Sequence, residues 1–322
     1  MKRLPVFLLV LALLLLVHPR ATAATVGIHL LHPQEIDQVR QLFPDTSVQA
    51  TEPVYVTIPY SLTDLSLRQE WQHFFTTARA NNIIPIVRLM TQFQDDVWTV
   101  PTRQDVVQLL ESLDQYDWPQ AERRIIIFNE PNHAAEWGGT VSPTEYADIF
   151  SFAASWAHTQ SHIYQVLPAA LDLSAPQSNE SWDAYAFWSS VYREDPEAFD
   201  QMDAWNSHSY PNPEFSAAPY RTGRTSMQGF KQELAWLEQW RSEPLQVYIT
   251  ETGWQANRAT SRYLQQYYTY ALQHIWSDDR VIAVTPFVLK GTPGPFSQFS
   301  FLTADDKPTV HFVAFQKALA SL

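Results

Sequence analysis

The sequence of 322 residues contains no cysteine. This absence excludes disulfide bonds, thiol catalysis and cysteine-ligated zinc. A chain of this length buries a core large enough to fold without disulfides. The motifs HExxH, GxSxG, the P-loop and the EF-hand loop are absent too, so the sequence predicts no metal site and no cofactor.

Basic residues are few, with 21 Lys and Arg against 34 Asp and Glu and a formal net charge of −13. This balance argues against nucleic acid as a partner, because binding to phosphates depends on Lys and Arg. Hydrophobic residues make up 45% of the chain, which excludes a disordered protein. The 12 Trp, 14 Tyr and 18 Phe suit both core packing and the stacking of flat ligands such as sugar rings.

Residues 1–23 have the order of a secretory signal peptide. A basic start is followed by an apolar stretch from Leu4 to Val17 and by the small residues Ala21 and Ala23. The apolar stretch is short for a membrane span. We therefore expect cleavage after Ala23 and a secreted or cell-envelope (periplasmic) protein, with an uncleaved anchor as the alternative. Residues 24–322 then form one catalytic domain.

Eight short apolar runs alternate with amphipathic stretches. Each run is bounded by Pro, Gly or Asn and is often rich in β-branched residues, which favours strands. Helical patterns lie between them, and Ser142, Pro143 and Glu145 form a helix-start signal after the fourth run. Tandem strand–helix units predict an α/β protein built as a single (β/α)8 TIM barrel. The alternative, a doubly wound open sheet, would usually show a GxGxxG turn, which is absent. The runs are residues 25–31, 54–60, 83–90, 123–130, 163–171, 202–210, 246–254 and 281–290.

The loops of the predicted barrel are asymmetric. Segments that lead into the runs are short, whereas those that follow them are long and rich in Pro, Gly and aromatic residues, such as residues 131–142 and 211–223. In a barrel the ligand binds to the loops at the carboxyl ends of the strands. The asymmetry therefore predicts a ligand site at that end.

Two of the predicted strands end on a glutamate. Glu130 ends the fourth run and Glu251 ends the seventh, so a closed barrel would open both side chains on the same face. Alternation predicts that Glu251 shares a strand face with Val247 and Ile249, and that Glu130 shares one with Ile126 and Phe128. A carboxylate in an apolar stripe is costly to desolvate without a partner. Two such groups across a cleft can hydrolyse a glycosidic bond, one as the acid and one as the ionised group. The alternative is two structural glutamates in salt bridges.

The motifs FNEPN (residues 128–132) and ITETGW (residues 249–254) resemble the signatures of the clan of retaining (β/α)8-barrel glycoside hydrolases. That clan includes cellulases, β-xylanases, β-mannanases, β-xylosidases and exopolysaccharide hydrolases. The resemblance implies that Glu130 is the acid/base and that Glu251 is the nucleophile. It also implies that Asn129 holds the sugar 2-hydroxyl.

Three further positions fit the resemblance. His208 and Tyr210, in the motif HSYP, match residues that touch the substrate or the nucleophile, although ordinary packing at a strand end is the alternative. Arg88, near the end of the third run, is expected to orient the nucleophile or to bind a sugar hydroxyl. The arginine typical of the clan lies one strand earlier, so Arg88 is a departure from the pattern.

Aromatic residues near the glutamates are candidates for sugar stacking. We expect this role for Trp137, in the loop after Glu130, and for Trp254, just beyond Glu251. The clan commonly has a Trp at the end of strand eight. This chain has Phe287 there instead, or else a loop supplies the sugar platform.

Together these features predict a secreted retaining β-glycosidase that acts on a polysaccharide or oligosaccharide as a monomer, without a protein partner. One alternative is a non-catalytic carbohydrate-binding barrel, which has no need for two acids. The other is an inverting or transglycosylating enzyme on the same scaffold.

Overall fold

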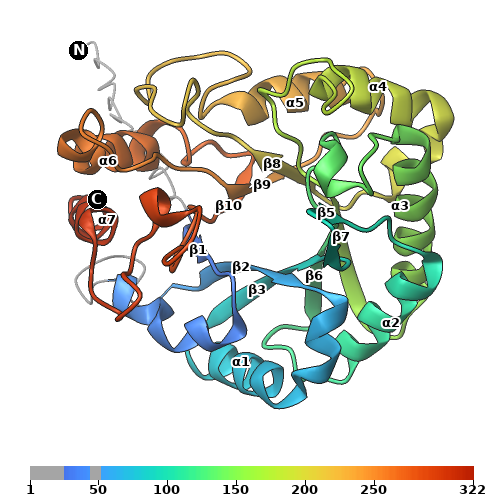
Figure 1. Ribbon diagram of the computed structural model, residues 1–322, viewed down its shortest axis with the longest axis horizontal. Coiled ribbons are helices and arrows are strands. Elements are labelled where there is room, and N and C mark those ends of the chain that lie inside the picture. Colours follow the sequence, from blue (N-terminus) through green and yellow to red (C-terminus); the bar gives the residue numbers. More distant parts are fainter. Residues whose placement is uncertain (1–24, 44–51) are drawn as a thin grey trace, which may run out of the picture.

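The computed structural model describes residues 25–43 and 52–322, and it has a mixed α/β fold (Figure 1). The predicted signal peptide, residues 1–23, lies outside this part of the chain. Within the described ranges, no helix is long and apolar enough to span a membrane.

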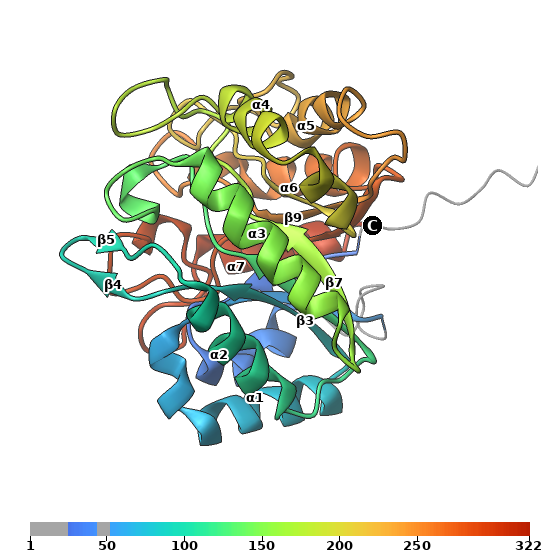
Figure 2. The same cartoon turned by 90° about the vertical axis from the view of Figure 1, so that its right-hand side faces the viewer.

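Each of the eight predicted apolar runs contains a parallel strand. These are β1 (Gly27–His29), β2 (Val54–Tyr60), β3 (Ile83–Leu89), β6 (Glu122–Ile127), β7 (Ile163–Pro168), β8 (Trp205–His208), β9 (Val247–Glu251) and β10 (Val281–Val284). Two further short strands, β4 (Phe93–Gln94) and β5 (Val97–Trp98), form an antiparallel hairpin after β3. Figure 2 shows this hairpin projecting beyond the helices.

The part of the chain that the structure describes has seven α-helices, and they surround the strands (Figure 1). The predicted start at Ser142 is confirmed, because its side chain accepts a hydrogen bond from the backbone N–H of Glu145 (3.3 Å) and Pro143 occupies the first turn. The helices are α1 (Arg68–Ala80), α2 (Arg103–Asp114), α3 (Pro143–His158), α4 (Ala184–Glu194), α5 (Gly229–Leu237), α6 (Leu264–His274) and α7 (Val310–Leu319). Short 3-10 helices are η1 (Pro33–Leu42), η3 (Leu62–Ser66), η4 (Ala134–Glu136), η5 (Pro196–Gln201), η6 (Ser261–Tyr263) and η7 (Ser297–Phe299).

The eight parallel strands form two sheets, in the orders β1-β2-β3-β6-β7 and β10-β9-β8. Isolated parallel bridges join the two sheets, between Val26 and Val284 at one junction and between Asp172 and His208 at the other. The prediction of eight parallel strands is therefore confirmed, but they form two bridged sheets rather than one continuous ladder.

A small apolar cluster is made by strand residues and by Ala204, which directly precedes β8. Its side chains alternate with others that pack in the much larger cluster, to which the helices contribute. The small cluster consists of Tyr55, Ile84, Ile86, Ile126, Leu167, Ala204, Tyr248 and Ala283. Val247, Ile249 and Phe128 belong to the larger cluster instead. The predicted side-chain alternation is thus wrong, because the two glutamates do not extend the faces of these three residues.

Local irregularities at the strand ends explain this correction. Strand β6 ends at Ile127, and the backbone then has positive φ angles at Phe128 (67°) and Glu130 (33°). Between β8 and β9, Ser207 pairs with Ile249 but His208 pairs with Glu251, so the register shifts by one residue. Strict alternation therefore stops before each glutamate.

Candidate active site

Glu251, the last residue of β9, is buried among polar side chains from three other strand ends. Its Oε1 atom accepts a hydrogen bond from Nη1 of Arg88 (2.6 Å), and its Oε2 atom accepts one from the hydroxyl of Tyr210 (3.0 Å). Nε2 of His29 lies 3.4 Å from Oε1. Both carboxylate oxygens are therefore held, which fixes the orientation of the group.

The environment of Glu251 keeps its carboxylate ionised. Burial alone would raise its pKa, but the positive charges of His208 and Arg88 outweigh burial and lower the pKa to about 2. Burial likewise opposes the charged form of His208, whereas the charge of Glu251 and the hydrogen bond to Glu130 raise the pKa of the imidazole above its ordinary value. At neutral pH the site therefore holds an anion at Glu251.

His208 lies between the two glutamates. Its Nδ1 atom is 2.7 Å from Oε1 of Glu130, and its Nε2 atom is 3.8 Å from Oε1 of Glu251. The structure thus brings together Glu130 and Glu251, which the sequence predicted at one end of the strands. Arg88, His208 and Tyr210, the three additional positions predicted near them, contact one or both carboxyl groups. Contact between these residues and a sugar stays a prediction.

His29, at the end of β1, belongs to this site but was not predicted. It is fully buried, and burial, followed by the charge of Arg88, lowers its pKa to about 3. The ring is therefore neutral, and its Nε2 atom lies 3.1 Å from Nη2 of Arg88, which can donate to it. Arg88 consequently bridges His29 and Glu251. The only signal in the sequence was one His inside the apolar run TVGIHLL.

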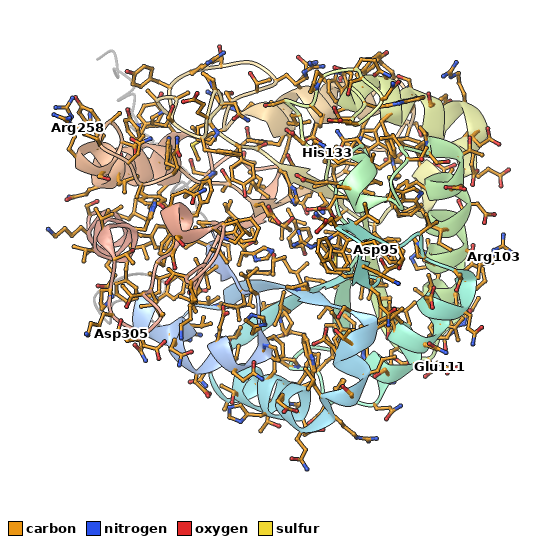
Figure 3. The ribbon with its side chains drawn as sticks, viewed as in Figure 1. Asp95, Arg103, Glu111, His133, Arg258 and Asp305 are labelled. Carbon is orange, nitrogen blue, oxygen red and sulfur yellow. The ribbon has the colours of Figure 1, made fainter. Side chains whose placement is uncertain are left out.

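The loop after β6 adds a third carboxyl group that was also not predicted. Nδ2 of Asn129 donates a hydrogen bond to Oε2 of Glu136 (3.2 Å), in the 3-10 helix η4. On the same loop, Nε2 of His133 lies 3.1 Å from Oδ2 of Asp172. In Figure 3 His133 lies inside the ring of helices, whereas labelled residues such as Arg103 lie at the rim.

The prediction that Trp254 stacks on sugar requires correction. Its indole is fully buried, and its N–H donates a hydrogen bond to the carbonyl of Ala217 (2.8 Å). The rings of Tyr267 and Tyr268 pack against it, with centroids 5.2 and 5.3 Å away. Trp254 therefore supports the loop after β9 from the core.

Trp137 is corrected for the same reason, since only 1% of it is exposed. Its N–H donates to Oε2 of Glu145 (3.2 Å), and the rings of Phe128 and Tyr146 pack against its edges. A ring that is covered by protein has no free face for a sugar. Phe287 lies close to the site, edge-on to His29 at 5.0 Å, but is also largely buried.

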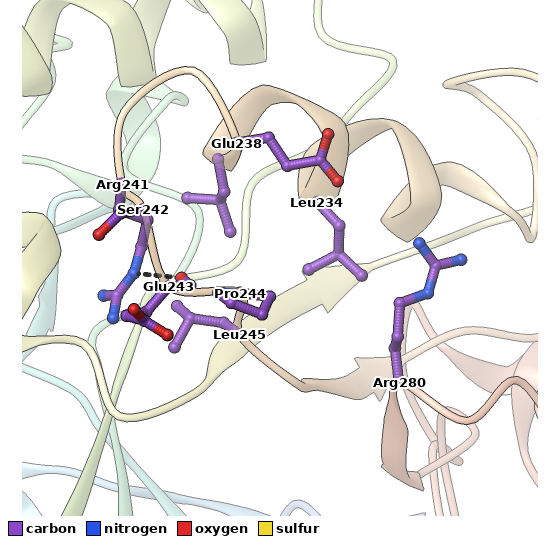
Figure 4. A pocket seen from close by; sticks show the side chains of 9 residues that line it. Leu234, Glu238, Arg241, Ser242, Glu243, Pro244, Leu245 and Arg280 are labelled. Carbon is purple, nitrogen blue, oxygen red and sulfur yellow. Dashed lines mark hydrogen bonds between the residues drawn. The ribbon is translucent and has the colours of Figure 1, made fainter.

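A surface pocket lies away from these residues (Figure 4). It is formed by the end of α5, by the segment that leads into β9 and by Arg280, which precedes β10. Nε of Arg241 donates to the carbonyl of Glu243 (2.9 Å) beside it. This pocket lies where the strands begin, at the end opposite to Glu251.

A parallel α/β scaffold that holds two glutamates on either side of one imidazole defines the class of site found in glycoside hydrolases. Residues 65–315 match the family model described as glycosyl hydrolase catalytic core, and the chain belongs to this family. The match begins after β1, so His29 lies outside it. None of the curated proteins matches the chain.

Solved structures with a similar fold are glycoside hydrolases of low sequence identity. A triple mutant of an endo-β-1,4-glucanase from Xanthomonas axonopodis pv. citri has a TM-score of 0.59 and 14% identity, over 93% of this chain and 100% of that one. An endo-β-1,3-glucanase of family GH128 from Sorangium cellulosum has a TM-score of 0.57 and 13% identity, over 92% and 97%. A family 39 glycoside hydrolase from Bacteroides cellulosilyticus has a TM-score of 0.59 and 15% identity, over 93% and 64%. The predicted resemblance to glycoside hydrolases is therefore confirmed by the family model, and the similar solved structures share the fold.

Proposed function

We propose that this protein is a retaining β-glycosidase that hydrolyses a polysaccharide or oligosaccharide by double displacement. In the first step, Glu130 donates a proton to the glycosidic oxygen while the carboxylate of Glu251 attacks the anomeric carbon. The leaving saccharide departs as an alcohol, and a glycosyl–enzyme ester forms. In the second step, Glu130 takes a proton from water, which attacks the anomeric carbon and restores the Glu251 carboxylate.

The observation that carries this proposal is the state of Glu251. A nucleophile must be ionised and oriented at neutral pH, and Glu251 is held by Arg88 and Tyr210 with a depressed pKa. Glu130 is linked to it through His208, which contacts both carboxyl groups. We assign Asn129, next to Glu130 in the chain, to the sugar hydroxyls.

We further propose that the substrate is a β-linked glucan, because two of the structural neighbours are endo-β-glucanases. The eight strands would form a (β/α)8 barrel, supported by the bridges Val26–Val284 and Asp172–His208. Residues 1–23 would direct the protein out of the cytoplasm, to the cell envelope or the medium. We expect the enzyme to act as a monomer.

The test is hydrolysis of a panel of β-glucans, xylans, mannans and galactans by the wild type and by Glu130→Gln and Glu251→Gln. Each variant should lose at least about 10³-fold in kcat on natural polysaccharides. Cleavage of these substrates requires both carboxyl groups. NMR of the first anomer released should show retention of configuration. Glu145→Gln serves as a matched control, since Glu145 is an exposed glutamate outside the pair. Two variants that hydrolyse as fast as the wild type would refute the assignment.

A further inference from the structure

Glu136 is a half-buried acidic side chain that the proposed double displacement does not use. It lies in η4, and its Oε2 atom accepts a hydrogen bond from Nδ2 of Asn129 (3.2 Å). Asn129 directly precedes Glu130 in the chain. Glu136 therefore reaches back to the site from the loop that follows the acid/base.

The backbone holds this loop in place. The N–H of His133 donates to the carbonyl of Glu130 (2.9 Å), and the N–H of Glu136 donates to the carbonyl of His133 (3.1 Å). The N–H of Gly138 donates to the carbonyl of Trp98 (2.7 Å), which ties the loop to the β4–β5 hairpin. The position of Glu136 relative to Glu130 is thus set by a series of short hydrogen bonds.

The charges around Glu136 come mainly from the catalytic residues. Burial, and next the negative charge of Glu130, raise the pKa of Glu136 to about 7. Arg88 opposes this rise and Glu251 adds to it, while His133 is the other titratable side chain that interacts with Glu136. Strand β5, which packs against η4, contributes no charged residue. Glu136 therefore gains its negative charge near neutral pH.

The hydrogen bond also orients the amide of Asn129. A carboxylate accepts hydrogen bonds only, so it selects the NH2 group and turns Oδ1 the other way. Oδ1 of Asn129 is buried and has no hydrogen-bond partner among the described residues. A buried acceptor without a partner is costly, and a sugar hydroxyl bound at this site would satisfy it.

We propose that Glu136 is a positioning residue that fixes the amide of Asn129 so that Oδ1 is left to accept a hydrogen bond from the sugar. The inference rests on the proposed roles of Glu130 and Asn129.

The variants Glu136→Gln and Glu136→Ala test this role, because Gln keeps an acceptor oxygen for Asn129 and Ala removes it. We expect kcat/KM of Glu136→Gln to stay within about twofold of the wild-type value, whereas Glu136→Ala should lose roughly 10-fold, since Asn129 then loses its partner.

Glu145→Gln is the matched control. Glu145 accepts a hydrogen bond from Trp137 next to the same loop and is exposed, so Glu145→Gln changes the net charge as Glu136→Gln does and should leave kcat/KM unchanged. A Glu136→Ala variant that keeps the wild-type kcat/KM overturns the inference, even if its Tm is lower. A wild type that cleaves no saccharide refutes the proposed function instead.

A measurement without substrate decides the inference independently. The side-chain amide signals of Asn129 in 1H–15N NMR spectra should shift with pH near neutrality in the wild type, because the charge of their acceptor changes. This titration should vanish in Glu136→Gln. A wild-type Asn129 amide that is insensitive to pH in this range overturns the inference.

Discussion

Nη1 of Arg88 lies 2.6 Å from Oε1 of Glu251, although the two residues are 163 positions apart in the chain. The same guanidinium places Nη2 3.1 Å from Nε2 of His29. Arg88 is buried, and so are both of its partners. One planar cation therefore fixes a carboxylate and a neutral imidazole through two different nitrogens, a rigid fork that the single ammonium nitrogen of lysine does not provide.

Arg88→Lys is expected to impair catalysis more than folding. A lysine could keep one contact with Glu251 but not the fork to His29, so the carboxylate would lose its orientation. We expect kcat to fall on the order of 10²-fold, measured by steady-state kinetics, with a smaller effect on KM. Unchanged kinetics would show that Arg88 only balances charge in the core.

Tyr210→Phe removes the hydroxyl that donates to Oε2 of Glu251 (3.0 Å). The Phe ring keeps the edge-on contact with Phe215, whose centroid is 5.0 Å away. A hydrogen bond to a charged group contributes about 1.5–3 kcal/mol, so we expect kcat/KM to fall roughly 10- to 100-fold. Tm should change little. A large loss of Tm with an unchanged kcat would contradict this assignment.

Glu35→Gln is expected to alter the pH dependence of stability. Glu35, in η1, is 4% exposed, and burial raises its pKa to about 8 from an ordinary value of 4.5. The folded state therefore holds a proton that the unfolded state releases. The wild type should lose free energy of unfolding as the pH rises from about 4.5 to 8, because the unfolded chain ionises first.

Urea unfolding at several pH values measures this loss. Glu35→Gln cannot ionise, so its free energy of unfolding should fall less over the same interval, and the two curves should converge below pH 4.5. Curves that stay parallel across the interval would show that Glu35 is not protonated in the folded protein.

Trp254→Phe tests the correction made for this residue. A buried indole that packs on Tyr267 and Tyr268 contributes to stability, so the variant should unfold more easily, by about 1–3 kcal/mol. Because no face of the ring is free, KM for oligosaccharides of any length should stay close to the wild-type value. A length-dependent rise in KM without a loss of stability would restore the stacking role.

The two glutamates could be predicted because each stands in a short polar motif at the end of an apolar run. Such a motif can be recognised in the sequence without knowing the backbone conformation. The face on which they lie could not be predicted by alternation. Positive φ angles at Phe128 and Glu130, and the register shift before Glu251, are set by the packing of neighbouring strands. Sequence periodicity describes regular strands only.

Residues outside such motifs were harder to assign. His29 looked like an ordinary member of an apolar run, and only its contact with Arg88, 59 positions away, gives it a role. Trp137 and Trp254 were misassigned because closeness in sequence to a glutamate says nothing about burial of the indole. Both rings turn toward the helices, where they add to the core.

The one-residue offset between β8 and β9 has a consequence for recombination between related enzymes. His208 pairs with Glu251 only because β9 contributes one extra residue, Thr250, at this place. A chimaera that exchanges β9 alone would inherit the glutamate and the extra residue but not the His208 with which the glutamate is paired. The segment from Trp205 to Glu251 is therefore the smallest unit that can be exchanged with the pair intact.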